Sequence, residues 1–393
     1  MKIVIASDKY KGNLSAVQVC NIIKEAILDY VNLNYSKKDL NVEVVISPMA
    51  DGGDGTVDTL VESLSGEFVK TKVKNPLGKE IQSYFGLIDS GKTAVIEMSL
   101  ASGLALIKPQ ERNPLITTTY GTGQLIRKAL DINCKKIIIG IGGSATNDAG
   151  IGALQALGVK FLDKENNEIG YGGGELIKID KIDISNIHPR IKETQIFIAC
   201  DVDNPLYGLK GAAYVYGPQK GADEKTVEFL DKGLRKFSKI VKKYLGKDIS
   251  KLKGGGAAGG LGAGLHAFLS AKLAPGAELV IQATGLEDKI KGANLIITGE
   301  GAMDNQTFFG KTAFGVANLA LKYKVPVITI NGSLNLDYSL IEQKRRQLFL
   351  ANFDIINKPM TLDEALKNSK KNLYFTAQEI IKLYLHLALK CCN

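Results

Sequence analysis

The chain has 393 residues, of which 45% are hydrophobic, 23% are charged and 42 are glycine. This length favours two domains, and the composition is that of a globular α/β enzyme, which excludes a disordered, fibrous or disulfide-stapled protein. The formal net charge of +9 comes from lysines spread among carboxylates, without the long basic run typical of nucleic-acid binding, so we expect no nucleic-acid partner.

The N-terminal segment has the pattern of a β-α-β unit. Residues 2–6, KIVIA, form a short apolar run that ends at the polar residues 7–9, as a buried strand does when it enters a loop. Apolar residues then recur at helical spacing over residues 14–27, with Ser15 as the helix cap. VEVVIS, residues 42–47, is the next predicted strand. Such units build parallel sheets, whose ligands bind beyond the carboxyl ends of the strands.

The pattern changes in the middle of the chain. Residues 67–98 form three extended runs separated by turns at 75–78 and 89–91, which predicts an antiparallel meander. The glycine-rich segment 254–265, GGGAAGGLGAGL, predicts a turn that enters a helix. Strand and helix signals alternate again at KKIIIGIGG (135–143), FIACDVDN (197–204), NLIITGEG (294–301) and VPVITING (325–332).

These elements predict an α/β fold with two domains. A Rossmann-like parallel-sheet domain is built from both chain ends, residues 1–66 and 285–393. Residues 67–284 form a second α/β domain inserted into it, which carries the antiparallel meander and a glycine-rich loop. The sequence leaves open whether the protein is a monomer or a homodimer.

The cysteines and the N-terminus indicate a cytoplasmic protein. The five cysteines are odd in number and lack metal-type pairing, so we interpret them as reduced thiols: Cys20, Cys134, Cys200, Cys391 and Cys392. The N-terminus becomes polar after six residues, unlike a signal peptide, and no apolar stretch reaches transmembrane length. We therefore expect no membrane partner.

The segment IIIGIGGSATNDAG, residues 137–150, is the strongest indication of a ligand site. A strand leads into Gly140, Gly142, Gly143 and Ser144, and a helix is expected to follow. Glycines let phosphate oxygens approach backbone N–H groups, and a helix N-terminus adds partial positive charge. The segment therefore predicts a phosphate cradle, with a tight turn that binds nothing as the alternative.

The same loop and a second glycine segment also match the patterns of other protein classes. Residues 140–145 also satisfy the dinucleotide fingerprint, with Asp163 at the distance of a ribose ligand, so a nicotinamide oxidoreductase is one alternative. Residues 310–312, Gly-Lys-Thr, resemble the end of a P-loop, but Asn305 stands where the first glycine belongs. Lys311 could face phosphate or be an ordinary solvated lysine.

Carboxylates recur in loops that follow strands or contain glycine. In a parallel sheet such loops converge on one edge, where carboxylates hold Mg²⁺ and one of them can accept a hydroxyl proton. Each acid taken alone is more often a turn or helix cap. The acids are Asp8, Asp51, Asp54, Asp201, Asp203, Glu300 and Asp304.

Several long segments, in the same order and spacing, resemble the type I glycerate kinases. The resemblance implies a two-domain kinase that phosphorylates D-glycerate with ATP and Mg²⁺, usually at the 2-hydroxyl. Phosphorylation at the 3-hydroxyl and a non-catalytic sugar-acid binding protein stay open as alternatives. The segments are KIVIASDKYKG, PMADGGDGT, NPLITTTYGTGQLI, IGIGGSATNDAG, ACDVDNPL, YGPQKGA, GAAGGLGAGL and ITGEGAMDNQT.

The resemblance also implies site residues, to which we assign roles. Catalysis is assigned to Asp201 as the base, with Lys11 and Asp8. D-Glycerate is expected against Asp8, Lys11, Asp51 and Asp54. The ATP phosphates are expected on Gly142, Gly143, Ser144, Asn147 and Lys311. Mg²⁺ is expected at Asp203, Glu300 and Asp304. Asp148 and Asn204 also match polar positions of the family.

The chain departs from the family pattern at two positions. Lys9 adds a positive charge to the Ser7–Gly12 loop, where the family commonly reads Pro-Asp-Ser-Phe-Lys-Gly. Ala302 stands where the family commonly has an arginine after Gly-Glu-Gly, so one cation that could stabilise the transferring phosphate is absent at that position. Lys9 and Lys311 are the candidates to replace it.

Overall fold

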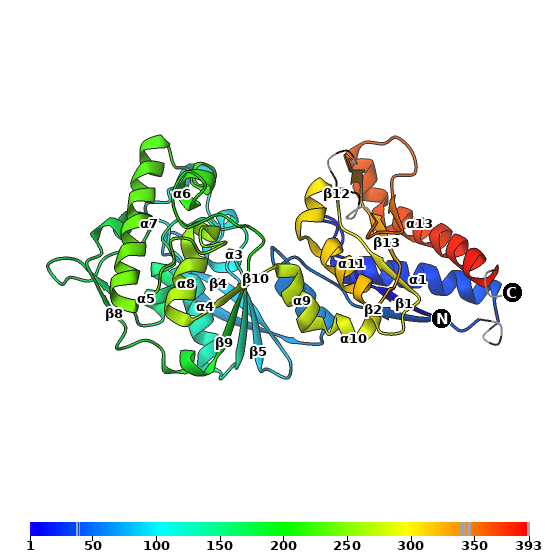
Figure 1. Ribbon diagram of the computed structural model, residues 1–393, viewed down its shortest axis with the longest axis horizontal. Coiled ribbons are helices and arrows are strands. Elements are labelled where there is room, and N and C mark those ends of the chain that lie inside the picture. Colours follow the sequence, from blue (N-terminus) through cyan, green and yellow to red (C-terminus); the bar gives the residue numbers. More distant parts are fainter. Residues whose placement is uncertain are drawn as a thin grey trace. The chain divides into compact units, whose positions relative to one another are not determined.

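Apolar runs rich in β-branched residues form the strands of two main sheets, one in each of two units of the chain (Figure 1). The computed structural model describes residues 1–36, 38, 40–337, 339, 341, 343 and 347–390, so Cys391 and Cys392 lie outside the described residues. Unit 1 comprises residues 1–51 and 280–393, and unit 2 comprises residues 52–279.

The unit boundaries differ from those we expected, which lay after residues 66 and 284. Helix α2 (Thr56–Ser63) packs against strands of the unit 2 sheet, so residues 52–66 belong to unit 2. At the other boundary, Thr284 Oγ1 lies 3.9 Å from the sulfur of Met49, and residues 280–284 belong to unit 1.

Unit 1 contains an all-parallel five-stranded sheet in the order β15-β13-β11-β1-β2. Ile3 pairs with Leu295 on one side and with Val44 on the other, so the first strand is enclosed by strands from both ends of the chain. The strands are β1 (Lys2–Ile5), β2 (Glu43–Ile46), β11 (Leu295–Thr298), β13 (Val327–Asn331) and β15 (Ala351–Asp354). A separate parallel pair consists of β12 (Met303–Asp304) and β14 (Leu334–Asn335).

Two long helices of unit 1 lie side by side, shown in blue and red in Figure 1: α1 (Ala16–Asn34) and α13 (Leu362–Lys390). Ser15 caps α1 in a capping box, as predicted. The Tyr374 hydroxyl donates to Asp29 at 2.7 Å and joins the two helices. Other helices of this part are α10 (Leu286–Ile290), α11 (Thr312–Lys322) and α9 (Gly276–Thr284), and α9 crosses the boundary between the units.

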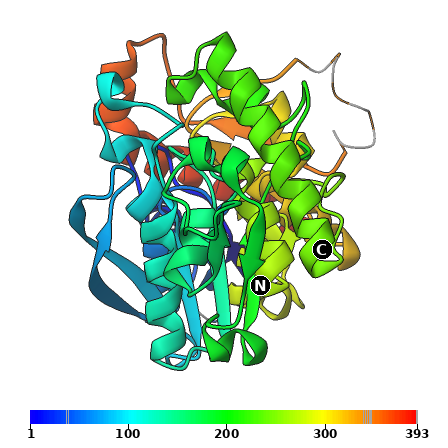
Figure 2. The ribbon, with the colours of Figure 1, turned by 90° about the vertical axis from the view of Figure 1, so that its left-hand side faces the viewer.

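Unit 2 contains a six-stranded sheet in the order β10-β9-β6-β5-β4-β3. The predicted meander is confirmed, because β3, β4 and β5 pair antiparallel, and Figure 2 shows this part in blue at one edge of the sheet. The other neighbours pair in parallel. The strands are β3 (Glu67–Lys74), β4 (Glu80–Ile88), β5 (Thr93–Glu97), β6 (Lys136–Gly140), β9 (Gln195–Ala199) and β10 (Lys272–Ala274), with a separate antiparallel pair of β7 (Lys160–Leu162) and β8 (Lys181–Asp183).

Helices enclose the core of unit 2, in which Phe85, Phe161 and Phe237 are fully buried. The mixed α/β class of the chain is therefore confirmed. Besides α2, the helices are α3 (Ser99–Ser102), α4 (Tyr120–Asp131), α5 (Ile151–Ala156), α6 (Ala212–Tyr216), α7 (Glu224–Leu245) and α8 (Leu261–Leu269). Within the described part of the chain, no helix combines the length and the apolarity needed to cross a membrane.

Candidate functional site

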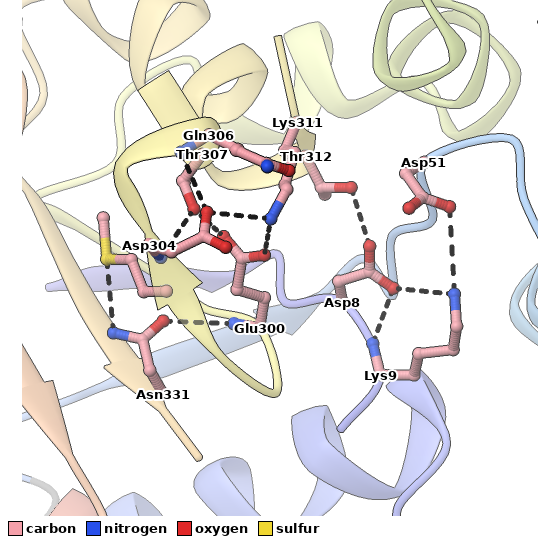
Figure 3. Close-up of polar contacts among 11 residues, drawn as sticks. Asp8, Lys9, Asp51, Glu300, Asp304, Gln306, Thr307, Lys311, Thr312 and Asn331 are labelled. Atoms are coloured by element: carbon pink, nitrogen blue, oxygen red, sulfur yellow. Dashed lines mark hydrogen bonds and ion pairs between the residues drawn. The ribbon is translucent and has the colours of Figure 1, made fainter. Parts of the chain in front are cut away.

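In unit 1 the loop after β1 holds the carboxylate of Asp8 in a buried position, with 6% of the residue exposed. The backbone N–H of Asp8 and the hydroxyl of Ser7 both donate to the carbonyl of Gly299, which ties the end of β1 to the end of β11. The carboxylate accepts from the Thr312 hydroxyl at 2.8 Å and from the Lys9 N–H at 2.7 Å (Figure 3). Burial raises the pKa of Asp8, although the charge of Lys9 opposes this shift.

Lys9 joins two of the predicted substrate residues. Its Nζ lies 3.6 Å from Asp8 Oδ1 and 3.8 Å from Asp51 Oδ1 (Figure 3). The extra positive charge of this sequence is therefore placed between two acids. The side chain of Lys11 is exposed, and its backbone N lies close to Gly301, where an added Cβ would be 3.0 Å away. Asp8, Asp51 and Lys11 thus belong to one end of the unit 1 sheet.

A second cluster follows β11. Lys311 Nζ lies 3.5 Å from Glu300 Oε2 and 3.2 Å from Asp304 Oδ1, and the Thr307 hydroxyl donates to Glu300 at 2.7 Å (Figure 3). Burial raises the pKa of Glu300, while Thr307 and Lys311 oppose the shift and the charge of Asp8 adds to it. Burial alone would lower the pKa of Lys311, but the two acids outweigh it and raise that pKa. Glu300, Asp304 and Lys311 are therefore brought together.

The three predicted metal ligands are not gathered within one unit. Asp203 belongs to unit 2, where its exposed carboxylate lies 3.4 Å from Lys253 Nζ. Across the described residues, no group of three or more acids, histidines or cysteines is arranged to hold a metal ion. Glu300 and Asp304 are two carboxylates that both lie beside Lys311. In proteins, Mg²⁺ is often held by one or two carboxylates and completes its shell with water and phosphate oxygens.

In unit 2 the loop after β6 exposes Gly142 and Gly143. Gly143 has a φ of +68°, a backbone conformation that glycine adopts without strain. A Cβ added to Gly143 would lie 3.2 Å from Asp54 Oδ1, so Asp54 lies beside this loop. Glu97 positions the neighbouring turn by accepting from the N–H groups of Gly55 and Val57 at 3.1 and 2.7 Å.

A buried lysine lies against the same loop and was not among the residues predicted from the sequence. Lys220 is only 1% exposed, and its Nζ donates to Ser144 Oγ at 2.8 Å and to the Thr146 carbonyl at 2.6 Å. Burial lowers the pKa of Lys220 to about 7, although the charge of Asp148 opposes the shift. The only signal in the sequence was the place of this lysine in the segment YGPQKGA.

The loop does not lead directly into a helix, so that expectation was wrong. Helix α5 begins only at Ile151 and has six residues. The preceding turn is held by Asp148, which is fully buried and accepts from Thr119 Oγ1 at 2.8 Å and from the Thr119 N–H at 2.9 Å. Asn147 is also fully buried, and its side-chain nitrogen and oxygen have no partner among the described residues, nor does Thr146 Oγ1.

Asp201 follows β9 and is exposed. Its Oδ1 accepts from the N–H of Gly276, the first residue of α9, at 2.9 Å. A carboxylate at this place stabilises the start of a helix. The geometry around Asp201 is therefore that of a residue that anchors α9.

Comparisons with known proteins show the family to which the chain belongs. The family model described as "Glycerate kinase family" matches residues 3–385. The chain belongs to the glycerate kinase family. A glycerate kinase of Halalkalibacterium halodurans is 48% identical over 96% of this chain and 97% of the relative, and a glycerate 2-kinase of Escherichia coli K12 is 44% identical over 97% of each. A crystal structure of a candidate glycerate kinase 2 from Salmonella typhimurium LT2 is 43% identical, covers 99% of both chains and superposes with a TM-score of 0.89.

The predicted site residues of this glycerate kinase family member fall into two groups, one in each unit. Unit 1 carries Asp8, Lys11, Asp51, Glu300, Asp304 and Lys311, and unit 2 carries Asp54, Gly142, Gly143, Ser144, Asn147, Asp201 and Asp203. Asp54, which was predicted to bind D-glycerate, lies next to the glycine loop of unit 2. The unit 2 group also contains Lys220, and the unit 1 group contains Lys9 and Thr312.

Proposed function

We propose that the protein is a cytoplasmic enzyme that transfers the terminal phosphoryl group of ATP to the 2-hydroxyl of D-glycerate. The observation that carries the proposal is the match of the glycerate kinase family over residues 3–385, together with relatives covered along almost their whole length. The name of the Escherichia coli relative, glycerate 2-kinase, favours the 2-hydroxyl over the 3-hydroxyl. Nothing in the family favours the alternative of a nicotinamide oxidoreductase.

The glycine loop of unit 2 fits the phosphates of ATP. Gly142 and Gly143 are exposed and lack side chains, so phosphate oxygens can approach the backbone closely. Lys220 lies against the next residue, Ser144, and brings a cationic group to the loop. Asn147 offers buried polar atoms that have no partner in the described part of the chain. We therefore assign the nucleotide phosphates to this loop.

Glu300 and Asp304 are the residues that we assign to Mg²⁺, without Asp203. When bound, the ion neutralises negative charge on the phosphates during transfer. Lys311 pairs with both acids, and of the two candidates it is the cation that we assign to the place of the arginine absent at Ala302. Kinases gain most of their rate from such positioning and charge neutralisation.

We assign the general-base role to Asp8 rather than to Asp201. Asp8 is buried beside Lys9 and Thr312, and its raised pKa makes it a better proton acceptor than an ordinary carboxylate. In the transfer, Asp8 accepts the hydroxyl proton, the hydroxyl oxygen forms a bond to the γ-phosphorus, and the bond from that phosphorus to the bridging oxygen of ADP breaks. Lys9 and Lys11 carry the positive charge suited to the carboxylate of D-glycerate.

The test is an ADP-release assay with the purified protein. ADP should form only when ATP, Mg²⁺ and D-glycerate are all present, and NMR of the product should identify 2-phosphoglycerate. Glycerol and lactate should be poor substrates, because each lacks a polar group and leaves its partner in the site unpaired, at about 1–3 kcal/mol each. Equal ADP release without D-glycerate would contradict the proposal, and ligand binding without turnover would favour the non-catalytic binding protein.

A further inference from the structure

We infer that Lys220 is a positioning residue of the nucleotide-phosphate site, where it holds the turn Ser144–Thr146 and supplies the buried positive charge that complements the bound phosphates. The inference rests on the proposed function and extends it to a residue outside the predicted site. Lys220 ends the short 3₁₀ turn Pro218–Lys220, and its side chain reaches two residues of the glycine loop from within the protein.

The first argument is the charge of Lys220. An ammonium group removed from water is costly unless an opposite charge compensates it. Lys220 donates to two neutral acceptors, the Ser144 hydroxyl and the Thr146 carbonyl. These two bonds occupy two of the three N–H groups of its ammonium. Among the described residues Lys220 forms no ion pair. An anion bound on the adjacent loop would supply the missing negative charge.

The second argument comes from the turn itself. Thr146 Oγ1 and both polar side-chain atoms of Asn147 are buried and have no hydrogen-bond partner in the described part of the protein. Buried polar groups in folded proteins are nearly always paired, and unpaired ones need an explanation such as a ligand. These atoms lie two and three residues after Ser144, and Lys220 contacts both Ser144 and the Thr146 carbonyl. The charge and the unpaired polar atoms therefore lie at the same turn.

The neighbouring charged groups do not neutralise Lys220. Asp148 is the acid whose charge acts on it, but the oxygens of Asp148 accept from Thr119, Gly150 and Gly152. The segments around Lys220 also carry the following titratable or charged side chains: Arg112, whose Nη1 donates to the Gln219 carbonyl, Tyr214 and Tyr216 on α6, and Asp223 and Glu224 at the start of α7. The lowered pKa of Lys220 agrees with this lack of a close counter-charge.

The test compares Lys220→Met with Lys236→Met. Lys236 is a matched control on α7, because its Nζ also donates to a backbone carbonyl, that of Ile177 at 2.6 Å. Within the described part of the chain, no hydrogen bond or ion pair connects Lys236 to the loop. Calorimetric titration with ADP should show binding about 10- to 100-fold weaker in Lys220→Met and within twofold of wild type in Lys236→Met. The affinity for D-glycerate should stay unchanged in both variants. A folded Lys220→Met protein that binds ADP as tightly as wild type would overturn the inference.

A measurement on the wild-type protein decides the matter if Lys220→Met does not fold. Because the pKa of Lys220 is about 7, most of the side chain is neutral at pH 8, and a bound anion favours the charged form. ADP binding at pH 8 should therefore take up protons, seen as different apparent enthalpies in two buffers of unequal ionisation enthalpy. The absence of proton uptake in that case would overturn the inference.

The outcome is separable from that of the proposed function, because ADP binding is measured without D-glycerate. A protein that binds ADP through Lys220 and phosphorylates another acceptor would contradict the proposed substrate and leave the inference standing. If the protein phosphorylates D-glycerate and the Lys220→Met variant binds ADP as tightly as wild type, only the inference is contradicted.

Discussion

Asp8 and Asp201 both follow buried strands, yet their carboxylates meet different surroundings. Asp8 is buried against Thr312 and Lys9, whereas Asp201 is exposed and accepts from the first N–H of α9. The sequence could place both acids at strand ends, because the apolar runs before them are clear. It could not rank them, because the Thr312 hydroxyl from which Asp8 accepts a hydrogen bond is far away along the chain.

The variants Asp8→Asn and Asp201→Asn should therefore lose different properties, the first turnover and the second stability. Asp8→Asn removes the proton acceptor at almost constant volume, so kcat should fall by roughly 10²- to 10⁴-fold while the apparent Mg²⁺ requirement stays the same. Asp201→Asn should retain most of kcat and lose about 1 kcal/mol of stability, because it weakens the start of α9. Steady-state kinetics and thermal melts of both variants check this. A larger loss of kcat in Asp201→Asn than in Asp8→Asn would indicate that Asp201 is the general base.

Lys220 shows why part of the site could not be predicted. In the sequence it stands in the turn Pro-Gln-Lys-Gly, where a lysine is expected to be solvated. Its burial results from the tertiary contact of that turn with Ser144 and Thr146, which no local pattern encodes. The glycines of the loop were predictable, because glycine is needed locally; the cation beside them was not.

At the scale of elements, the glycine-rich segment 254–265 has a packing role for the phosphate loop. The helix predicted in it is α8, and the turn before it contains Gly259 with a φ of +67°. A Cβ added to Gly259 would lie 2.1 Å from the Thr146 carbonyl oxygen and 2.5 Å from the Asn147 Cα. The segment therefore packs directly against the backbone of the turn that Lys220 holds. Its helix could be predicted from apolar spacing, whereas this contact could not.

The pair Gly259→Ala and Gly246→Ala tests this packing. Gly246 follows α7 with the same φ of +67°, but an added Cβ would meet nothing within 4 Å. Gly246→Ala should therefore cost only the backbone strain, roughly 1–2 kcal/mol. Gly259→Ala adds a collision with backbone and should be clearly less stable and bind ADP more weakly. Melting temperatures and ADP titrations measure both effects, and equal losses in the two variants would mean that the turn can yield to the added methyl group.

At the scale of the whole molecule, each unit has its own hydrophobic core. The core of unit 1 includes Ile3, Ile23 and Leu295, and that of unit 2 includes Phe85 and Phe161. The sequence indicated that both chain ends share one sheet, because short apolar strand signals alternate with helix signals at both ends. The compact units divide after residue 51 and not after residue 66, because the strands that α2 packs against, β4 and β5, belong to unit 2 and come only after it in the sequence.

The separate cores predict that residues 52–284 fold without the rest of the chain. This fragment keeps the whole six-stranded sheet and all of α9, including the contact of Asp201 with Gly276. It should show a cooperative thermal transition by circular dichroism and should bind ADP, since it contains the glycine loop and Lys220. A fragment that melts without a cooperative transition would show that unit 2 depends on unit 1 for its stability.

The enclosed position of β1 has a consequence for the synthesis of the protein. Its neighbour β2 leaves the ribosome soon after it, but its other neighbour, β11, begins only at Leu295. At about 5–20 residues per second, the wait is on the order of tens of seconds. During this time one edge of the apolar strand KIVI has its backbone N–H and C=O groups unpaired, a state that invites pairing with other chains. We expect the nascent chain to recruit chaperones at this stage, and to release them once β11 has emerged.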